Sequence, residues 1–211
     1  MIVKVCGMRE PANIRAVEEC GVDWIGFIFY PRSPRCLTAK PAYLPQKARR
    51  IGVFVDAPRE EILLRAAEYG LHGVQLHGNE TPDLCRAMQS AGFKVIKALP
   101  AQAIDRCTDY EGVCDYFLFD SPTPQHGGSG VAFDWAQLDR YRLSTPFLLS
   151  GGLGPENLAA LLRWNHPQWA GIDLNSRFER QPAIKDVEKL HAYISRFRAH
   201  NFEQTFSNSR L

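Results

Sequence analysis

The stretch FLLSGGLGPEN, residues 147–157, passes from an apolar run through three glycines to a proline. A short apolar run is typical of a buried strand, and a proline suits the first turn of a helix. The stretch therefore predicts a strand, a glycine turn at residues 150–154 and a helix over 155–164. Glycine turns let backbone N–H groups converge on an oxyanion beside a positive helix N-terminus. Gly151 and Gly152 are candidates for phosphate binding, although any tight turn can use glycines.

Seven further apolar runs repeat this unit, so that strands are predicted at 2–6, 24–29, 51–55, 73–76, 95–99, 116–119, 147–149 and 171–174. Most runs are continuous rather than alternating, as in parallel strands that are covered on both faces. Helical periodicity or a starting proline predicts helices at 11–20, 58–68, 82–91, 155–164 and 184–200. The pattern predicts an α/β fold, a single (β/α)8 TIM barrel with an all-parallel closed sheet.

The domain prediction is one barrel catalytic domain over residues 1–200, followed by a polar, frayed C-terminal tail at 201–211. An open doubly wound sheet shares the alternation of strands and helices. Eight strands in 211 residues, without GxGxxG after the first strand, favour the closed barrel. Prolines after the second strand and glycines after the sixth predict long loops at the C-terminal end of the strands, where barrel enzymes carry their active sites.

The overall charge points to no polyanionic partner. The chain has 25 basic and 23 acidic residues, a net charge of +2, so neither a nucleic-acid nor a membrane partner is expected. No signal-peptide pattern or long apolar segment occurs, and the six cysteines lack CxxC spacing. These features predict a cytoplasmic protein with reduced thiols. Without paired histidines, a Walker loop or a dinucleotide fingerprint, no metal or cofactor is expected.

Two residues at predicted strand ends are candidates for acid–base chemistry. Cys6 ends the first strand and Asp120 the sixth, which places both at the mouth of the barrel. The Cys6 thiol becomes a useful base if Lys4, on the same strand face, favours the thiolate; a packed cysteine is the alternative. Apolar neighbours of Asp120 favour its protonated form and a general-acid role, with a helix or loop cap as the alternative.

Polar residues after other strands are candidates for substrate binding. Asn175 and Ser176 follow the eighth strand and can complete the phosphate site, while Asp173 could order that loop, touch a sugar or cap a turn. Arg35 lies in a proline-stiffened loop that suits a carboxylate clamp. His77 could bind or titrate, but a structural role is the better interpretation.

Several motifs, taken in order, resemble one enzyme family. They are KVCG at 4–7, GFIFYPRSPR at 26–35, GVFVD at 52–56, QLHGNE at 75–80, GGSG at 127–130 and LSGGLGPEN at 149–157. In order and spacing the chain resembles phosphoribosylanthranilate isomerases of tryptophan biosynthesis over nearly the whole barrel. The resemblance implies a small phosphosugar substrate and a monomer or homodimer.

The resemblance also implies a reaction and the residues that perform it. N-(5′-phosphoribosyl)anthranilate would be converted by an Amadori rearrangement, without metal or coenzyme, into 1-(2-carboxyphenylamino)-1-deoxyribulose 5-phosphate, the third step of the tryptophan branch. Asp120 would be the general acid that opens the ribose ring to a Schiff base. Cys6 would be the general base that removes the C2′ proton to give an enolamine. Arg35 would hold the anthranilate carboxylate, and a loop with Gly127 and Gly128 would cover the substrate.

One position departs from the family pattern, because Arg177 stands where the family commonly has glycine. It either alters the turn or adds a phosphate contact. Two competing functions are a histidine-pathway isomerase, which would have an acid at the position of Cys6, and a barrel kept only for binding. The latter would be expected to lack Cys6, Asp120 or the glycine turn, and all are present.

Overall fold

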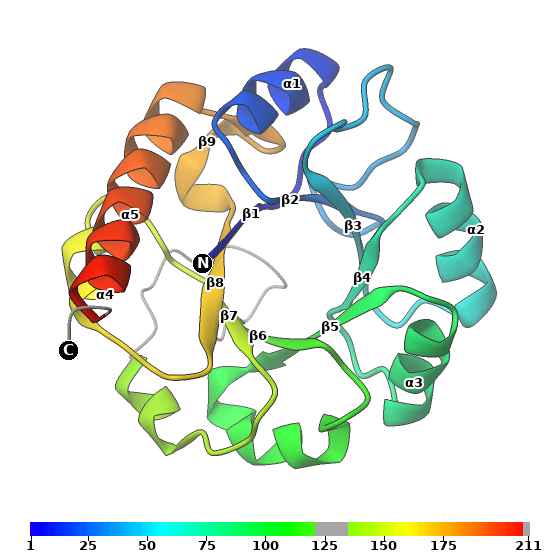
Figure 1. Cartoon of the computed structure of the whole chain (residues 1–211). Helices are drawn as coiled ribbons and strands as arrows, with labels where there is room; N and C mark the ends of the chain where they lie inside the picture. Colours follow the sequence, from blue (N-terminus) through cyan, green and yellow to red (C-terminus); the bar gives the residue numbers. More distant parts are fainter. Residues whose placement is uncertain (121–134, 209–211) are drawn as a thin grey trace.

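The structure, a computed structural model, describes residues 1–120 and 135–208, with side chains through residue 200. Eight parallel strands close into a barrel in sequential order, ringed by helices (Figure 1). The strands are β1 (Ile2–Val5), β2 (Trp24–Ile28), β3 (Arg49–Phe54), β4 (Gly73–Leu76), β5 (Lys94–Pro100), β6 (Tyr116–Asp120), β7 (Phe147–Leu149) and β8 (Trp169–Leu174). The predicted closed parallel sheet is confirmed.

Strand β1 closes the barrel because it pairs with both β2 and β8. Lys4 lies opposite Trp24 on one side and opposite Asp173 on the other. This register brings together residues from the two ends of the chain. The register therefore places the charged side chains of Lys4 and Asp173 next to each other inside the barrel.

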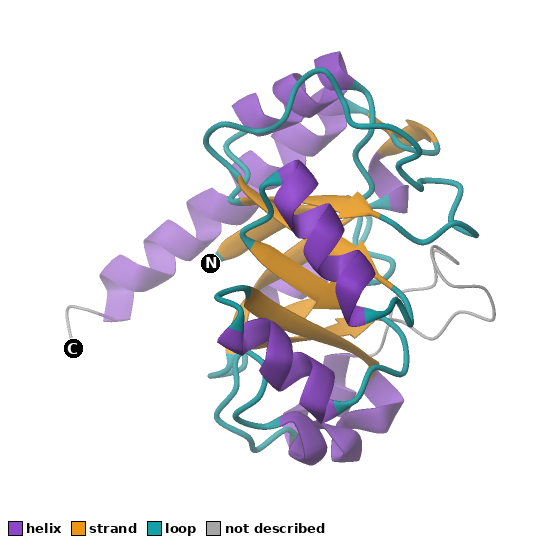
Figure 2. Cartoon of the chain, turned by 90° about the vertical axis from the view of Figure 1, so that its right-hand side faces the viewer, coloured by secondary structure: helices purple, strands orange, loops and turns teal. Residues whose placement is uncertain are grey.

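Helices lie on the outside of the barrel, as the side view shows (Figure 2). They are α1 (Pro11–Glu19), α2 (Arg59–Tyr69), α3 (Pro82–Ser90), α4 (Leu158–Arg163) and α5 (Val187–Asn208), with 3₁₀ segments η1 (Ala101–Tyr110), η2 (Trp135–Arg140) and η3 (Ser176–Phe178). Local signals explain several ends. Thr81 caps α3 by accepting a hydrogen bond from the Leu84 N–H, and Gly70 ends α2 with a φ of 55°. No helix in the described part of the chain has the length and apolar character to cross a membrane.

Two helices begin three residues later than predicted. Helix α4 begins at Leu158, not at Pro155, because the Asn157 amide bonds across the preceding turn to Gly152 and Gly154. Helix α5 begins at Val187, since β10 (Ile184–Lys185) instead pairs antiparallel with β9 (Glu179–Gln181). The helical interpretation of 184–186 was wrong, because a short strand pair outweighs the local periodicity there.

The C-terminal end of α5 extends away from the barrel (Figure 2). The helix continues to Asn208, so most of the segment predicted as a frayed tail is helical. The division of the chain into a domain at 1–200 and a tail at 201–211 stays a prediction, and its boundary does not coincide with a helix end.

The connection between β2 and β3, residues 29–48, consists of turns and a single bridge between Ile28 and Cys36. The long loop predicted there is confirmed. The loop predicted after β6 falls on residues 121–134, which lie outside the described residues, as do Gly127 and Gly128.

The core has two parts. A small cluster consists of strand residues only, among them Trp24, Ile51, Ile96, Leu118 and Leu148, and fills the inside of the barrel. A much larger cluster also includes helix residues and fills the space between the sheet and the helices. Buried polar groups of the barrel interior therefore lie outside this small apolar cluster, toward the carboxyl ends of the strands.

Candidate active site

Cys6 follows β1 at the mouth of the barrel, where its side chain is only 3% exposed. Its backbone N–H donates to the Leu174 carbonyl at 2.9 Å, which ties the thiol to the end of β8. Gly26 on β2 leaves the space that the thiol occupies, because a Cβ there would lie 2.7 Å from Cys6 Sγ. Gly7 has a φ of 73°, which turns the chain away directly after the thiol.

Lys4 lies below the thiol on the same strand face, fully buried, with its Nζ 3.0 Å from Asp173 Oδ2. Burial raises the pKa of the Cys6 thiol, Lys4 opposes the rise, and Asp173 adds to it. The predicted influence of Lys4 thus has the expected direction. It does not outweigh burial, because the Asp173 carboxylate neutralises much of the lysine charge.

Asp173 presents an unused acceptor to the interior of the mouth. One carboxylate oxygen binds Lys4, while Oδ1 is buried and has no hydrogen-bond partner among the residues described. Burial raises the pKa of Asp173 against the field of Lys4. Because buried polar atoms are normally hydrogen-bonded, Oδ1 is suited to accept a bond from a ligand hydroxyl.

Asp120 is the last residue of β6, with a side chain that is 24% exposed. Its Oδ2 lies 3.6 Å from Nε2 of His77, which is 31% exposed. The other imidazole nitrogen lies 2.8 Å from the buried Gln75 amide, which holds the ring in orientation. The sequence favoured a structural role for His77, whereas the structure places it at the mouth, facing Asp120.

Arg35 reaches the mouth from the 29–48 loop and is held by Glu179. Its Nε donates to Glu179 Oε1 at 2.9 Å and its Nη2 to Oε2 at 2.6 Å. Within the described part of the chain Nη1 makes no hydrogen bond, so one edge of the guanidinium is left for a ligand. Burial acts to raise the pKa of Glu179, but Arg35 and Lys185 outweigh it and lower this pKa.

Lys185 is a buried residue of the site that sequence reasoning missed. Its Nζ lies 2.6 Å from Glu179 Oε1 and 2.7 Å from Asn175 Oδ1. The prediction of a helix over 184–200 concealed its role, because a lysine near the start of a surface helix is expected to be exposed to solvent. The available signal was the position of Asp186, which suits a helix start and leaves Lys185 before the helix.

The glycine turn follows β7 at the same mouth. Gly151 and Gly152 have φ values of 78° and 66°, a conformation that explains why both are glycine. Arg177 lies across from this turn, with its Nε 3.5 Å from Glu156 Oε1. The residues predicted to bind phosphate therefore follow two neighbouring strands, β7 and β8. The ion pair between Arg177 and Glu156 connects the two loops.

The structure brings most of the predicted site residues to one end of the barrel. Cys6, Asp120 and Asn175 with Ser176 end or follow parallel strands, Asp173 is the last residue but one of β8, and Gly7 packs against both Arg35 and Asn175. Gly151 and Gly152 join them after β7, whereas Gly127 and Gly128 lie outside the described residues. No three potential metal-ligating side chains gather into a metal site in the parts of the chain at 1–120 and 135–208.

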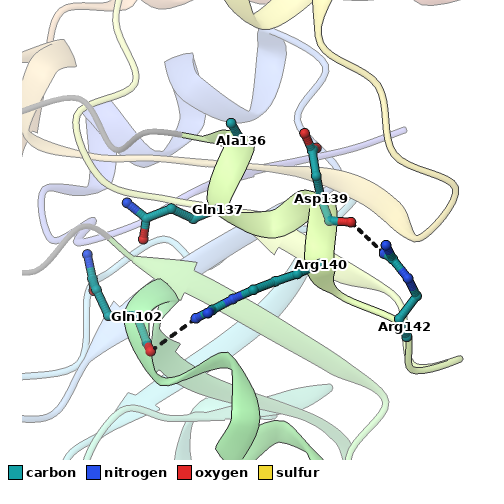
Figure 3. Close-up of a pocket in the computed structure, with 6 residues that line it drawn as sticks. All are labelled: Gln102, Ala136, Gln137, Asp139, Arg140 and Arg142. Atoms are coloured by element: carbon teal, nitrogen blue, oxygen red, sulfur yellow. Dashed lines mark hydrogen bonds between the residues drawn. The ribbon is translucent and has the colours of Figure 1, made fainter.

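Two cavities are lined by other parts of the chain. One, of about 540 Å³, lies beside η1 and η2 and is lined by Gln102, Ala136, Gln137, Asp139, Arg140 and Arg142 (Figure 3). Arg140 and Arg142 there bond to backbone carbonyls, the first to that of Gln102 and the second to that of Asp139. The other, of about 740 Å³, lies at the N-terminal end of the strands around Trp24 and Tyr116. Neither contains a predicted site residue.

Comparison with known proteins identifies the family of the chain. The family profile for N-(5′-phosphoribosyl)anthranilate (PRA) isomerase matches residues 3–196. The N-(5′-phosphoribosyl)anthranilate isomerase of Phocaeicola vulgatus is 56% identical over 201 residues, covering 94% of this chain and 98% of the relative.

Solved structures give the same result. The phosphoribosyl anthranilate isomerase of Thermus thermophilus superposes with a TM-score of 0.78 at 31% identity, covering 94% of this chain and 99% of the other. A phosphoribosyl anthranilate isomerase in complex with reduced 1-(o-carboxyphenylamino)-1-deoxyribulose 5-phosphate gives 0.74 at 31% identity, covering 92% and 97%. The chain belongs to the N-(5′-phosphoribosyl)anthranilate isomerase family of enzymes.

Proposed function

We propose that this enzyme converts N-(5′-phosphoribosyl)anthranilate into 1-(2-carboxyphenylamino)-1-deoxyribulose 5-phosphate by an Amadori rearrangement, as a step of tryptophan biosynthesis. The observation that carries the proposal is the presence, at one barrel mouth, of a buried thiol directly after β1 and a partly exposed carboxyl at the end of β6. Family membership supports the substrate. An acid and a base held in one mouth can act on adjacent atoms of a bound sugar.

Asp120 acts as the general acid. It donates a proton to the ribose ring oxygen as the bond from this oxygen to C1′ breaks, and the anilino nitrogen lone pair forms the Schiff base. His77, 3.6 Å from Asp120, orients the carboxyl and is itself held by Gln75. The partial exposure of Asp120 gives the carboxyl access to solvent for reprotonation.

Cys6 acts as the general base. Its thiolate takes the C2′ proton of the Schiff base, which gives an enolamine; the enolamine then tautomerises to the ketone. Burial raises the pKa of Cys6, so the thiolate fraction is small, but a thiolate of higher pKa is a stronger base. The adjacent iminium nitrogen makes the C2′ proton acidic enough to match.

Charged and polar groups around the mouth hold the substrate. The free edge of Arg35 binds the anthranilate carboxylate, and Asp173 Oδ1 accepts a bond from a ribose hydroxyl. Gly151, Gly152, Asn175 and Ser176 bind the phosphate through N–H and hydroxyl donors. Gly127 and Gly128 are proposed to cover the substrate on sequence grounds alone.

The setting of the enzyme is also part of the proposal. A branch of amino-acid biosynthesis and reduced cysteines fit a cytoplasmic enzyme, which would bind the small phosphosugar and neither nucleic acid nor membrane. It would work as a monomer or homodimer, which sedimentation of the purified chain distinguishes.

The test follows the loss of anthranilate-type fluorescence from freshly generated phosphoribosylanthranilate in metal-free buffer. Wild type should consume the substrate, whereas Cys6→Ser and Asp120→Asn should each lose at least about 10²-fold in kcat. Matched controls are Cys36→Ser, a half-buried thiol in the 29–48 loop, and Asp105→Asn, an exposed carboxylate on η1. A folded but inactive wild type would refute the reaction, and full activity in either site variant would refute that residue's role.

A further inference from the structure

Lys185 and Glu179 form a buried ion pair that the proposed acid–base scheme leaves without a role. Lys185 is 2% exposed, and its Nζ lies 2.6 Å from Glu179 Oε1. Burying a lysine and a glutamate costs desolvation energy that their attraction only partly returns. The pair therefore invites a functional explanation, and its position beside the thiol supplies one.

Contacts connect the Lys185 ammonium to the turn that carries the thiol. Its Nζ donates to Asn175 Oδ1 at 2.7 Å. The same Asn175 oxygen lies only 3.1 Å from the position that a Cβ of Gly7 would take, directly after Cys6 in the chain. Lys185 thus holds in place the side chain against which the Cys6 turn packs.

Five charged groups form two clusters near the thiol, and the two clusters differ in net charge. Lys4 from β1 and Asp173 from β8 make one cation and one anion, which cancel. The second cluster contains Arg35 from the 29–48 loop and Lys185 from β10, which share the single carboxylate of Glu179.

This second cluster carries one positive charge in excess. Lys185 accordingly lowers the pKa of Cys6, which burial raises. Without Lys185 both clusters would be neutral, and Lys4, paired with Asp173, would alone oppose the cost of burying a thiolate.

We propose that Lys185 is a positioning residue for the reaction: its buried ammonium orders the Asn175 side of the mouth and stabilises the Cys6 thiolate. This inference rests on the proposed role of Cys6 as the base. It assigns Glu179 the opposite electrostatic effect, because its negative charge reduces the excess.

The experiment measures the pH dependence of iodoacetamide alkylation at the Cys6 peptide, mapped by mass spectrometry, in the full-length protein without substrate. Lys185→Met should slow alkylation at a fixed pH below the midpoint by about three- to tenfold, because the thiolate becomes rarer. Lys185→Arg keeps the charge and should restore the wild-type midpoint. Glu179→Gln should move the midpoint in the opposite direction, toward lower pH.

A matched control is Lys97→Met. Lys97 is also a fully buried lysine, with its Nζ 2.7 Å from Glu80 Oε2, and it is not among the groups that act on Cys6. It should lose stability as Lys185→Met does but leave the Cys6 midpoint unchanged. Circular dichroism checks that each variant is folded.

The outcomes separate this inference from the proposed function. Opposite shifts in Lys185→Met and Glu179→Gln, with rescue by arginine, support the electrostatic role. Shifts of the same sign, or an unchanged midpoint in folded Lys185→Met, overturn it. Alkylation of Cys6 needs no turnover. An inactive wild type would therefore overturn the proposed reaction, whereas the alkylation midpoints would still test the effect of Lys185 on the thiol.

Discussion

Replacing Gly26 with alanine should move the thiol without removing it. The backbone of Gly26 is not in the left-handed region, so alanine fits the local conformation. Its Cβ would lie 2.7 Å from Cys6 Sγ and 3.1 Å from Cys6 Cα. Ordinary contacts between non-bonded heavy atoms of this kind lie at about 3.5–4.0 Å. The sulfur must therefore move by about 1 Å, by rotation or by a shift of β1.

A displacement of this size has two measurable effects. Overpacking of a filled site costs about 1–3 kcal/mol of unfolding free energy. A misplacement of about 1 Å at a reacting group can lower the rate by about 10²-fold. We expect Gly26→Ala to lose stability moderately and kcat/KM severely.

The control is Gly52→Ala on β3, whose Cβ would lie 2.7 Å from Phe54 Cε2 in the outer core, away from the mouth. Chemical denaturation should give comparable destabilisation in both variants, while the fluorescence assay should find activity lost only in Gly26→Ala. Wild-type kcat/KM in a folded Gly26→Ala enzyme would refute the reasoning that the position of the thiol sets the rate.

Three further predictions concern other sites. If Arg177 contacts the substrate phosphate, Arg177→Ala raises KM severalfold while Glu156→Gln does not. Equal effects of the two substitutions would show that Arg177 acts only through its ion pair with Glu156. Glu18→Gln should cost about 1–3 kcal/mol, because the carboxylate accepts two backbone N–H groups. Burial acts to raise the pKa of Glu18, but these bonds and a tyrosine hydroxyl lower it. The stabilisation by the carboxylate is therefore complete above about pH 4.3 and is lost as the pH falls through the lowered pKa. The prediction is wrong if urea unfolding gives the same difference in stability between wild type and Glu18→Gln down to about pH 2. Burial raises the pKa of Cys85 to about 11 and of Cys107 to about 12. Iodoacetamide at about pH 8 should therefore leave both thiols unmodified in the native protein. Labelling of either thiol before the protein unfolds would contradict their burial.

The order of elements could be predicted because each depends on local pattern. Continuous apolar runs mark strands that are buried on both faces, and all eight were found close to their predicted positions. The mouth residues Cys6 and Asp120 followed from the same pattern, since parallel strands of a barrel end together. Errors arose where local signals were weak, as at Ile184–Lys185, where pairing with β9 outweighed helical periodicity.

Sequence by itself determined the barrel, the position of its mouth, the family and the thiol and carboxyl candidates, because these depend on short-range pattern and on ordered motifs. Only the tertiary structure decided the electrostatics of the site. Lys4 meets Asp173 across 169 positions of the chain, and Arg35 meets Glu179 across 144. Such pairs exist only once the barrel has closed and its register is fixed, because no local signal in the chain specifies which buried charge will face which.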